Sequence, residues 1–118
     1  MVPTAYRPDA SEPGAEDMKV ESTHHVDASE RDARGFYQWR YEYDIFRFTE
    51  GEVTLVARSY VDEPQEAHFL RAEEGGASRF ISGDDLATPL FREAVDYLRR
   101  SGRSVLRRLG GDGYEPIG

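Results

Sequence analysis

Residues 36–60 read FYQWRYEYDIFRFTEGEVTLVARSY, and this stretch decides the fold. Between Tyr37 and Ile45, large apolar side chains alternate with polar ones, which is the pattern of a strand buried on one side. Phe46 and Phe48 then take the opposite parity. This change indicates either a β-bulge near Ile45 or a strand end that is buried on both faces.

A turn and a second strand follow directly. Gly51 lies in the polar stretch 49–52 and can adopt the positive φ that a tight turn requires. Alternation resumes at Val53, so we predict a β-hairpin. Pro64 interrupts the second strand, and residues 67–72 suit a third strand. The sequence therefore predicts an antiparallel meander.

Other segments leave alternatives open. Residues 18–26 contain a few strand-forming residues and are compatible with a short strand. Residues 78–81 suit an edge strand or an extended lead-in to a helix. Residues 104–109 suit a strand or a further turn of helix, and we favour the strand. Residues 114–117 are compatible with folding back over the edge of the sheet.

One helix is well specified between residues 89 and 100. Thr88 is a favourable N-cap, and Pro89 suits the first helical position. Gly102 suits the left-handed conformation that ends a helix. Apolar residues recur at three- and four-residue spacing on one face of this helix: Leu90, Phe91, Ala94, Val95 and Leu98.

These elements predict an α+β fold. We expect a mainly antiparallel sheet of three to five strands, arranged as a meander, with one C-terminal amphipathic helix packed on one face. Residues 1–34 are poor in aromatic side chains and rich in acids, so we expect a largely disordered acidic N-terminal tail. Residues 35–118 are expected to form a single domain.

Composition limits the class of protein. The chain has 118 residues and a formal net charge of -8 at pH 7, which disfavours nucleic acid and anionic membranes as partners. It contains no cysteine, which excludes disulfides and thiolate metal sites. The sequence shows neither the ~20 apolar residues of a membrane span nor the apolar run of a signal peptide near its start. We therefore expect a cytoplasmic protein.

The rings of the first predicted strand have two interpretations. Aromatic side chains are enriched at protein interfaces, but a helix packed on a sheet needs large apolar partners. We therefore expect the helix to cover the odd-numbered rings, which are Tyr37, Trp39, Tyr41 and Tyr43. The even-numbered side would then be polar and exposed. The expected partner-binding residues are Arg40, Glu42, Asp44, Arg58, Tyr60, Asp62 and Glu63.

No motif of a catalytic, cofactor-binding or metal site occurs in the sequence. His24 and His25 lie near acids, but neighbouring side chains of a strand point to opposite sides and do not converge on one metal. His68 lies on a predicted strand without the motif that would accompany a catalytic triad. The acid pairs lie in predicted turns, where carboxylates stay solvated. A non-enzymatic protein without cofactor or metal is therefore favoured.

A basic patch is predicted near the C-terminus. It consists of Arg99, Arg100, Arg103, Arg107 and Arg108. We expect these arginines to pair with acids of the sheet and to interact with the end of the helix, in preference to binding nucleic acid.

The first functional prediction is a small acidic protein-binding module that acts through a polar, acidic sheet surface on a basic protein partner. In general layout the chain is similar to small acidic bacterial binding proteins such as toxin-neutralising immunity proteins, a likeness that rests on no motif. A regulatory role is equally open. The alternative is a small-ligand or enzymatic pocket between the aromatic strand and the helix, with polar groups from Arg40, Tyr60 or His68. A third is nucleic-acid contact through the arginine cluster.

Overall fold

The computed structural model describes residues 18–111 and 113–117. Within these residues the fold is α+β, with a mainly antiparallel sheet and one α-helix, as predicted. The first half of the expected N-terminal tail lies outside the described residues. In its second half, a short strand over residues 18–26 was one of the alternatives, and the structure shows a strand there, β1.

The sheet has seven strands, more than the three to five predicted. The segments whose structure the sequence left open, near residues 18–26, 78–81, 104–109 and 114–117, all contribute strands that pair with a neighbour in the sheet. The order across the sheet is β1-β2-β3-β4-β6-β7, and β5 also pairs with β4. The strands are β1 (Lys19–Ala28), β2 (Arg40–Glu50), β3 (Val53–Tyr60), β4 (Glu66–Glu74), β5 (Ala77–Arg79), β6 (Val105–Gly110) and β7 (Gly113–Pro116). A short 3-10 helix η1 (Asp85–Ala87) precedes the helix α1 (Pro89–Arg100).

The helix begins where the sequence indicates. The Thr88 hydroxyl accepts a hydrogen bond from the Phe91 amide at 3.2 Å, and Pro89 follows at the first helical position. Because β6 runs parallel to β4, the chain needs a crossover between them, which α1 supplies. None of the described helices is long and apolar enough to cross a membrane.

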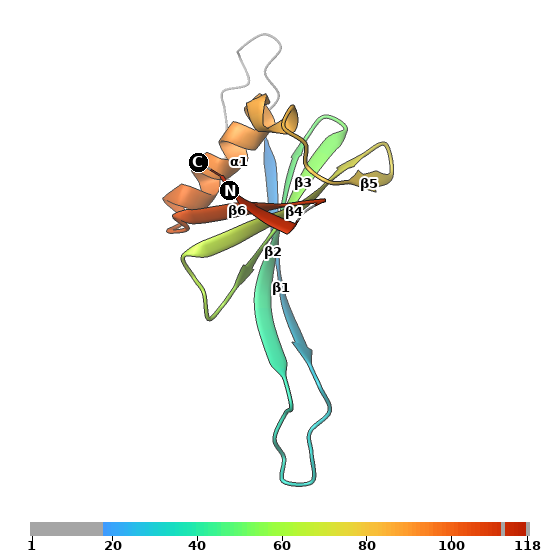
Figure 1. The fold of residues 1–118 in the computed structure, drawn as a ribbon, viewed down its shortest axis with the longest axis vertical. Helices are drawn as coiled ribbons and strands as arrows, with labels where there is room; N and C mark the ends of the chain where they lie inside the picture. The colour runs from blue at the N-terminus through green and yellow to red at the C-terminus, as the bar shows by residue number, and fades with distance from the viewer. Residues whose placement is uncertain (1–17, 112, 118) are drawn as a thin grey trace.

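The core lies between α1 and one face of the sheet. Phe48, Phe69 and Leu98 are completely buried, and burying a side chain of this size contributes about 1.5–3 kcal/mol to stability. Figure 1 shows α1 near the end of the sheet where β2 and β3 are joined, with the β1–β2 hairpin extending away from it. The core cluster also includes Phe46, Leu55, Ala57, Ala67, Ala72, Ile81, Leu90, Phe91, Ala94, Val95 and Leu106.

The prediction that α1 covers the odd-numbered rings was wrong. Trp39 is 47% exposed and Tyr41 is 53% exposed, whereas Phe46 and Phe48 lie under the helix. The 12-residue helix is about 18 Å long, and the 11-residue strand β2 is about 37 Å long. The helix therefore covers only one end of β2, and the residues at that end that face it are even-numbered.

The change of parity in β2 does not mark a bulge. The pairing of β2 with β1 and with β3 runs without a shift through Ile45. The irregularity lies one strand further, where β3 pairs with β4 between Val56 and Ala57. The sequence pattern changes parity because the aromatic residues of β2 lie on different faces at its two ends. Tyr41 and Tyr43 lie on the face opposite α1, whereas Phe46 and Phe48 lie on the face that α1 covers.

Residues 26–42 of the β1–β2 hairpin extend beyond the last pair that β2 forms with β3 (Figure 1). Together with the neighbouring pairs His24–Asp44 and His25–Tyr43, they form the outer part of the hairpin, residues 24–44, which we call the ribbon. It accounts for the elongated shape of the molecule, with extents of 61 × 37 × 29 Å. Polar contacts order its tip. The Ser29 hydroxyl accepts a hydrogen bond from the Gln38 amide at 2.8 Å, and the Asp32 carboxylate accepts one from the Phe36 amide at 3.0 Å.

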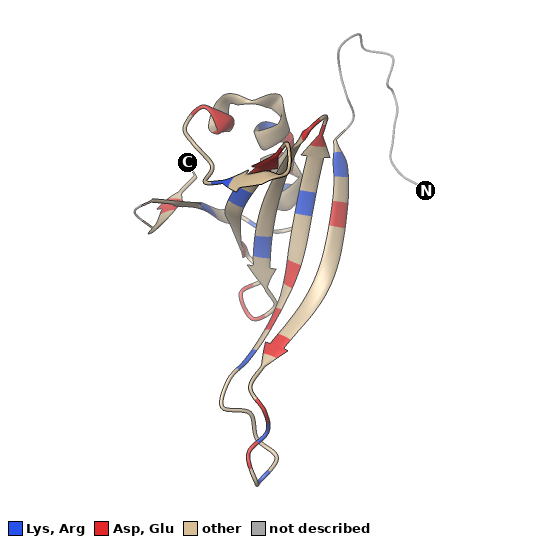
Figure 2. Ribbon diagram, turned by 90° about the vertical axis from the view of Figure 1, so that its right-hand side faces the viewer, with Lys and Arg blue, Asp and Glu red and all other residues tan. Residues whose placement is uncertain are grey.

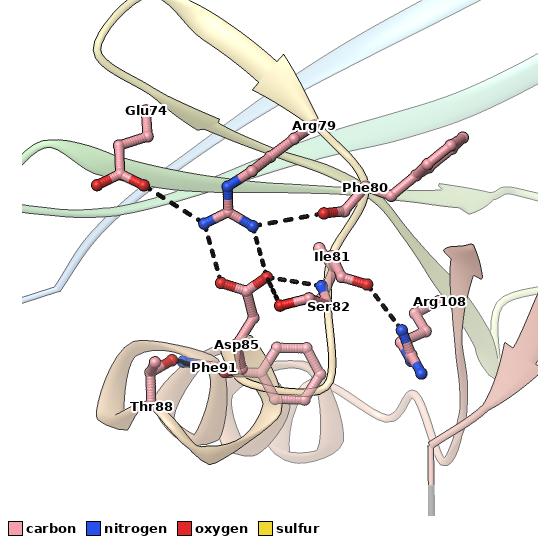
Figure 3. Close-up of polar contacts among 9 residues, drawn as sticks. All are labelled: Glu74, Arg79, Phe80, Ile81, Ser82, Asp85, Thr88, Phe91 and Arg108. Atoms are coloured by element: carbon pink, nitrogen blue, oxygen red, sulfur yellow. Dashed lines mark hydrogen bonds and ion pairs between the residues drawn. The ribbon is translucent and has the colours of Figure 1, made fainter. Parts of the chain in front are cut away.

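A buried carboxylate connects β5 to the segment that leads into α1 (Figure 3). Asp85 is 8% exposed. It accepts two hydrogen bonds from Arg79, at 2.6 and 3.0 Å, and one from the Ser82 amide at 2.7 Å. Hydrogen bonding from Arg79 is the main cause that lowers the pKa of Asp85 below its usual value. This ion pair fixes the chain at the start of the crossover.

Two alanine substitutions distinguish the two ends of β2. Phe48→Ala should lower the free energy of unfolding by about 3–5 kcal/mol, because it leaves a cavity under α1. Tyr41→Ala should lower it by less than about 1 kcal/mol, because this ring is half exposed. Urea unfolding followed by circular dichroism measures both values. Equal costs at the two positions would contradict the assignment of the core face.

Asp85→Asn tests the buried carboxylate. It should lower the free energy of unfolding by about 1–3 kcal/mol, because the charged hydrogen bonds from Arg79 are weakened. The lowered pKa means that this contribution is present above pH 3.8 and is lost as pH falls through the folded-state pKa of Asp85. Asp84→Asn is the control, because the Asp84 side chain is exposed. The free energy of unfolding of both variants is measured between neutral and acid pH. An equal loss of stability in Asp85→Asn and Asp84→Asn would contradict the role of the buried carboxylate.

Candidate functional site

The face of the sheet opposite α1, which we call the open face, carries a row of exposed and half-buried rings. These rings form the aromatic ladder: His25, Trp39, Tyr41, Tyr43 and Tyr60. The centroids of consecutive rings are 5.8 Å apart for Trp39–Tyr41, 6.0 Å for Tyr41–Tyr60, 5.7 Å for Tyr60–Tyr43 and 5.4 Å for Tyr43–His25.

Strand register explains the ladder. His25 of β1 and Tyr60 of β3 both pair with Tyr43 of β2, so their side chains share one face. Tyr41 precedes Tyr43 by two residues and points the same way. Ring separations between about 4.5 and 7 Å favour aromatic contact. The rings of the ladder are therefore held by their neighbours in the ladder, and none of the described helices packs over them.

A guanidinium group lies at the inner end of the ladder. The Cζ atom of Arg58 is 4.8 Å from the centroid of the Tyr60 ring and 6.0 Å from that of Tyr43. Its Nη2 donates a hydrogen bond of 3.1 Å to the hydroxyl of Tyr114, whose ring contacts His68 at 4.6 Å. Cations are attracted to the faces of aromatic rings, and the ladder already holds one from its own chain.

Carboxylates lie beside the ladder. The Tyr43 hydroxyl donates a hydrogen bond of 2.7 Å to Asp27, and this bond is the main cause that raises the pKa of Tyr43. Asp62 and Glu63 are exposed in the turn that follows Tyr60. Figure 2 shows acidic positions along the outer parts of β1 and β2 and in the β3–β4 turn. The ladder therefore combines ring faces with negative charge.

The reverse face of the ribbon holds a histidine between two acids. His24 Nδ1 is 2.7 Å from Asp44 Oδ1, and His24 Nε2 is 2.6 Å from Glu42 Oε2. A neutral imidazole has one N–H group, so both hydrogen bonds require the imidazolium form. The hydrogen bond to Asp44, followed by that to Glu42, raises the pKa of His24, and the bond to His24 is the main cause that lowers the pKa of Glu42.

The expected partner-binding residues do not form one surface. Glu42 and Asp44 lie on the reverse face with His24, and Arg40 bonds to Glu42 at 3.2 Å. Arg58 and Tyr60 lie on the open face, while Asp62 and Glu63 lie in the turn. The alternation in β2 and β3 separates them, because pairing of Ile45 with Arg58 places Arg58 on the odd-numbered side of β2.

The exposure of Tyr37, Trp39 and Tyr41 fits the alternative interpretation of these rings, that of an interface. Trp39, Tyr41 and Tyr43 are the residues that the predicted site lacked. The signal that could have identified them was the pair Phe46 and Phe48, which supply the large apolar partners that α1 requires.

The predicted basic patch is dispersed. Arg103 donates to the Ser59 hydroxyl at 2.9 Å and packs on Phe46, with Cζ 4.8 Å from the ring centroid. Arg108 donates to the Ile81 carbonyl at 2.7 Å and pairs with Glu115 at 2.9 Å. The other members lie elsewhere: Arg99 and Arg100 in the exposed last turn of α1, and Arg107 4.0 Å from Glu66.

The residues proposed for a pocket between the aromatic strand and the helix do not meet there. Arg40 lies on the ribbon, and Tyr60 and His68 lie on the open face. Phe48 and Leu98 fill the layer between β2 and α1. In the described part of the chain, no group of three or more His, Asp or Glu side chains is arranged to hold a metal ion.

The chain matches no protein-family model, and no curated protein or solved structure is significantly similar to it. The geometry and chemistry of its own surfaces are therefore the basis on which a function can be proposed for this protein.

The His24 contact predicts a dependence on pH. The raised pKa of His24 means that its contribution to stability is present below pH 6.5 and is lost as pH rises through the folded-state pKa. The lowered pKa of Glu42 means that its contribution is lost as pH falls below 4.5. The stability difference between wild type and His24→Gln should therefore be largest between pH 4.5 and 6.5, as measured by urea unfolding.

An NMR titration of the His24 ring provides a second measurement. Asp44→Asn should lower the pKa of His24, because it removes the largest cause of the shift. Asp62→Asn is the control, since Asp62 lies in the β3–β4 turn. An unchanged His24 pKa in Asp44→Asn would contradict the contact.

Proposed function

We propose that this protein is a non-enzymatic protein-binding module, and that its ribbon binds a basic, extended segment of a partner protein. The observation that carries the proposal is the aromatic ladder, whose outer rings Trp39 and Tyr41 are exposed on a part of the sheet that projects from the core. A cytoplasmic location is part of the same proposal.

Exposure of the rings favours an interface. Trp39, Tyr41 and Tyr37 are each at least 40% exposed. Tryptophan and tyrosine are among the residue types that contribute most of the binding energy at protein interfaces. Contiguous exposed apolar surface on a small protein commonly marks a binding site. Covering these rings with a partner would remove apolar surface from water at little cost to the core.

Charge and ring chemistry together favour a basic partner. Asp27, Asp62 and Glu63 flank the ladder on a protein of net charge -8, which accelerates association with a positively charged segment. Three rings of the ribbon and its neighbourhood already contact guanidinium groups. Tyr60 and Tyr43 contact Arg58, and Tyr37 contacts Arg31 at 5.2 Å. Arginine side chains of a partner can use the remaining ring faces in the same way.

A peptide titration tests this proposal. The probe is a synthetic peptide with arginine at every second position, compared with lysine and glutamate versions of equal length. Trp39 is the one tryptophan of the chain, so its fluorescence reports binding at the ladder. The arginine peptide should bind most tightly, because guanidinium combines charge with ring stacking, and its affinity should fall with added salt.

Matched variants locate the binding. Replacing Tyr41 and Tyr60 by isoleucine keeps strand-forming side chains but removes two rings, and should weaken the arginine peptide about tenfold. Asp27→Asn should also weaken it, whereas Asp96→Asn, an equal change of charge on the exposed side of α1, should not. Equal affinity for the glutamate peptide, or unchanged affinity in the double isoleucine variant, would refute the proposal.

An extract of the native cell gives an independent measurement. At low ionic strength the wild-type chain should retain a basic protein that the double isoleucine variant fails to retain, since the ladder supplies the contact. Retention of no protein by the wild-type chain would contradict a protein-binding role.

A further inference from the structure

A hollow lies on the open face where two strands share one edge of β4. β5 pairs with residues 72–74 of β4, and β6 pairs with residues 66–69. Leu70 and Arg71 lie between these two pairings, beside the irregularity in the β3–β4 register. Because β5 runs antiparallel to β4 and β6 runs parallel to it, both strands run toward residues 70 and 71, which neither of them pairs with.

The hollow is large enough for a small molecule. Its volume is about 680 Å³, within the range of ligand pockets. Its lining contains both apolar groups and three arginines. The lining residues are Arg58, Leu70, Arg71, Ser78, Arg79, Phe80, Leu109 and Tyr114.

The three arginines differ in whether a carboxylate neutralises the positive charge of the guanidinium group. Arg71 pairs with Glu73 at 3.0 Å, and Arg79 pairs with Asp85 at 2.6 Å. Arg58 has no carboxylate within 4.0 Å among the described residues. Its Nη2 donates to Tyr114, while Nη1 has no acceptor among residues 18–111 and 113–117, and its buried Nε has none either. A partly buried arginine without a counterion is costly unless an anion compensates it.

The apolar part of the lining is exposed to solvent. Phe80 is 55% exposed and Tyr114 is 42% exposed. Figure 3 shows the ring of Phe80 directed away from Asp85, while the neighbouring Arg79 side chain reaches toward that carboxylate. The Arg79–Asp85 ion pair thereby fixes the segment that presents Phe80.

We propose that this hollow binds a small organic anion with a flat apolar body, whose carboxylate or phosphate group lies on Arg58 and whose body lies against Phe80 and Tyr114. Guanidinium groups bind carboxylates and phosphates through paired, charge-assisted hydrogen bonds. Aromatic side chains give a flat molecule contact at favourable offset or edge geometry. The hollow shares Arg58 with the inner end of the ladder, whereas Phe80 and Tyr114 lie outside the ribbon. The proposed anion site does not depend on the proposed protein partner.

Four probes separate the parts of this ligand. Phenyl phosphate and benzoate carry the two anionic groups on a ring, inorganic phosphate carries the anion alone, and benzyl alcohol carries the ring alone. Amide NMR titrations of the full chain should show saturable shifts at Leu70, Arg71, Phe80 and Tyr114 with at least one ring-bearing anion below about 10 mM. Binding of phenyl phosphate alone identifies a phosphate ester, and binding of benzoate alone identifies a carboxylate. Inorganic phosphate and benzyl alcohol should bind about tenfold more weakly.

Variants tie the binding to the hollow. Arg58→Gln should weaken the anion about tenfold, and Arg92→Gln, the same change at an exposed position of α1, should leave affinity unchanged. Phe80→Ala, at an exposed ring, replaces Arg58→Gln if that variant does not fold and should weaken binding severalfold. Three results would overturn the proposal: no saturation with either ring-bearing anion, wild-type affinity in both variants, or equal affinity for inorganic phosphate and phenyl phosphate.

Discussion

In the part of the chain that the structure describes, one 12-residue α-helix packs on a seven-stranded sheet, and its contact with Phe46 and Phe48 determines what else is buried. Because the helix covers the inner end of β2, no described element packs on either side of its outer end. Rings project from one side of that outer end and a histidine between two acids lies on the other. Both faces of the ribbon are therefore accessible because α1 covers only the inner end of β2.

The crossover through α1 has a second effect on the surface. It returns the chain parallel to β4, so β6 and β5 must share one edge of that strand. Asp85 is buried at the beginning of this connection and is compensated by Arg79. The same connection thus produces the core layer on one side and the hollow on the other, although no residue of α1 lines that hollow.

Much of the fold could be predicted from local signals. Thr88 and Pro89 marked the helix start, and the hairpin around Gly51 formed as expected, with Gly51 at a φ of +62°. The strand count was too low because β1 and β7 have weak intrinsic signals and form only by pairing with neighbours. The buried face of β2 was assigned wrongly, because alternation shows that two faces differ but does not show which one a distant helix covers. The hollow could not be predicted, since Arg58, Phe80 and Tyr114 are brought together by strand order alone.

The continuity of β2 links two regions with different tolerance to mutation. Its inner phenylalanines are packed among many core side chains, whereas its outer tyrosines contact mainly each other and solvent. Substitutions at the outer end can therefore accumulate without crossing the stability threshold that limits the inner end. Within one uninterrupted strand, the specificity of such a protein can diverge between descendants while its folding stays the same.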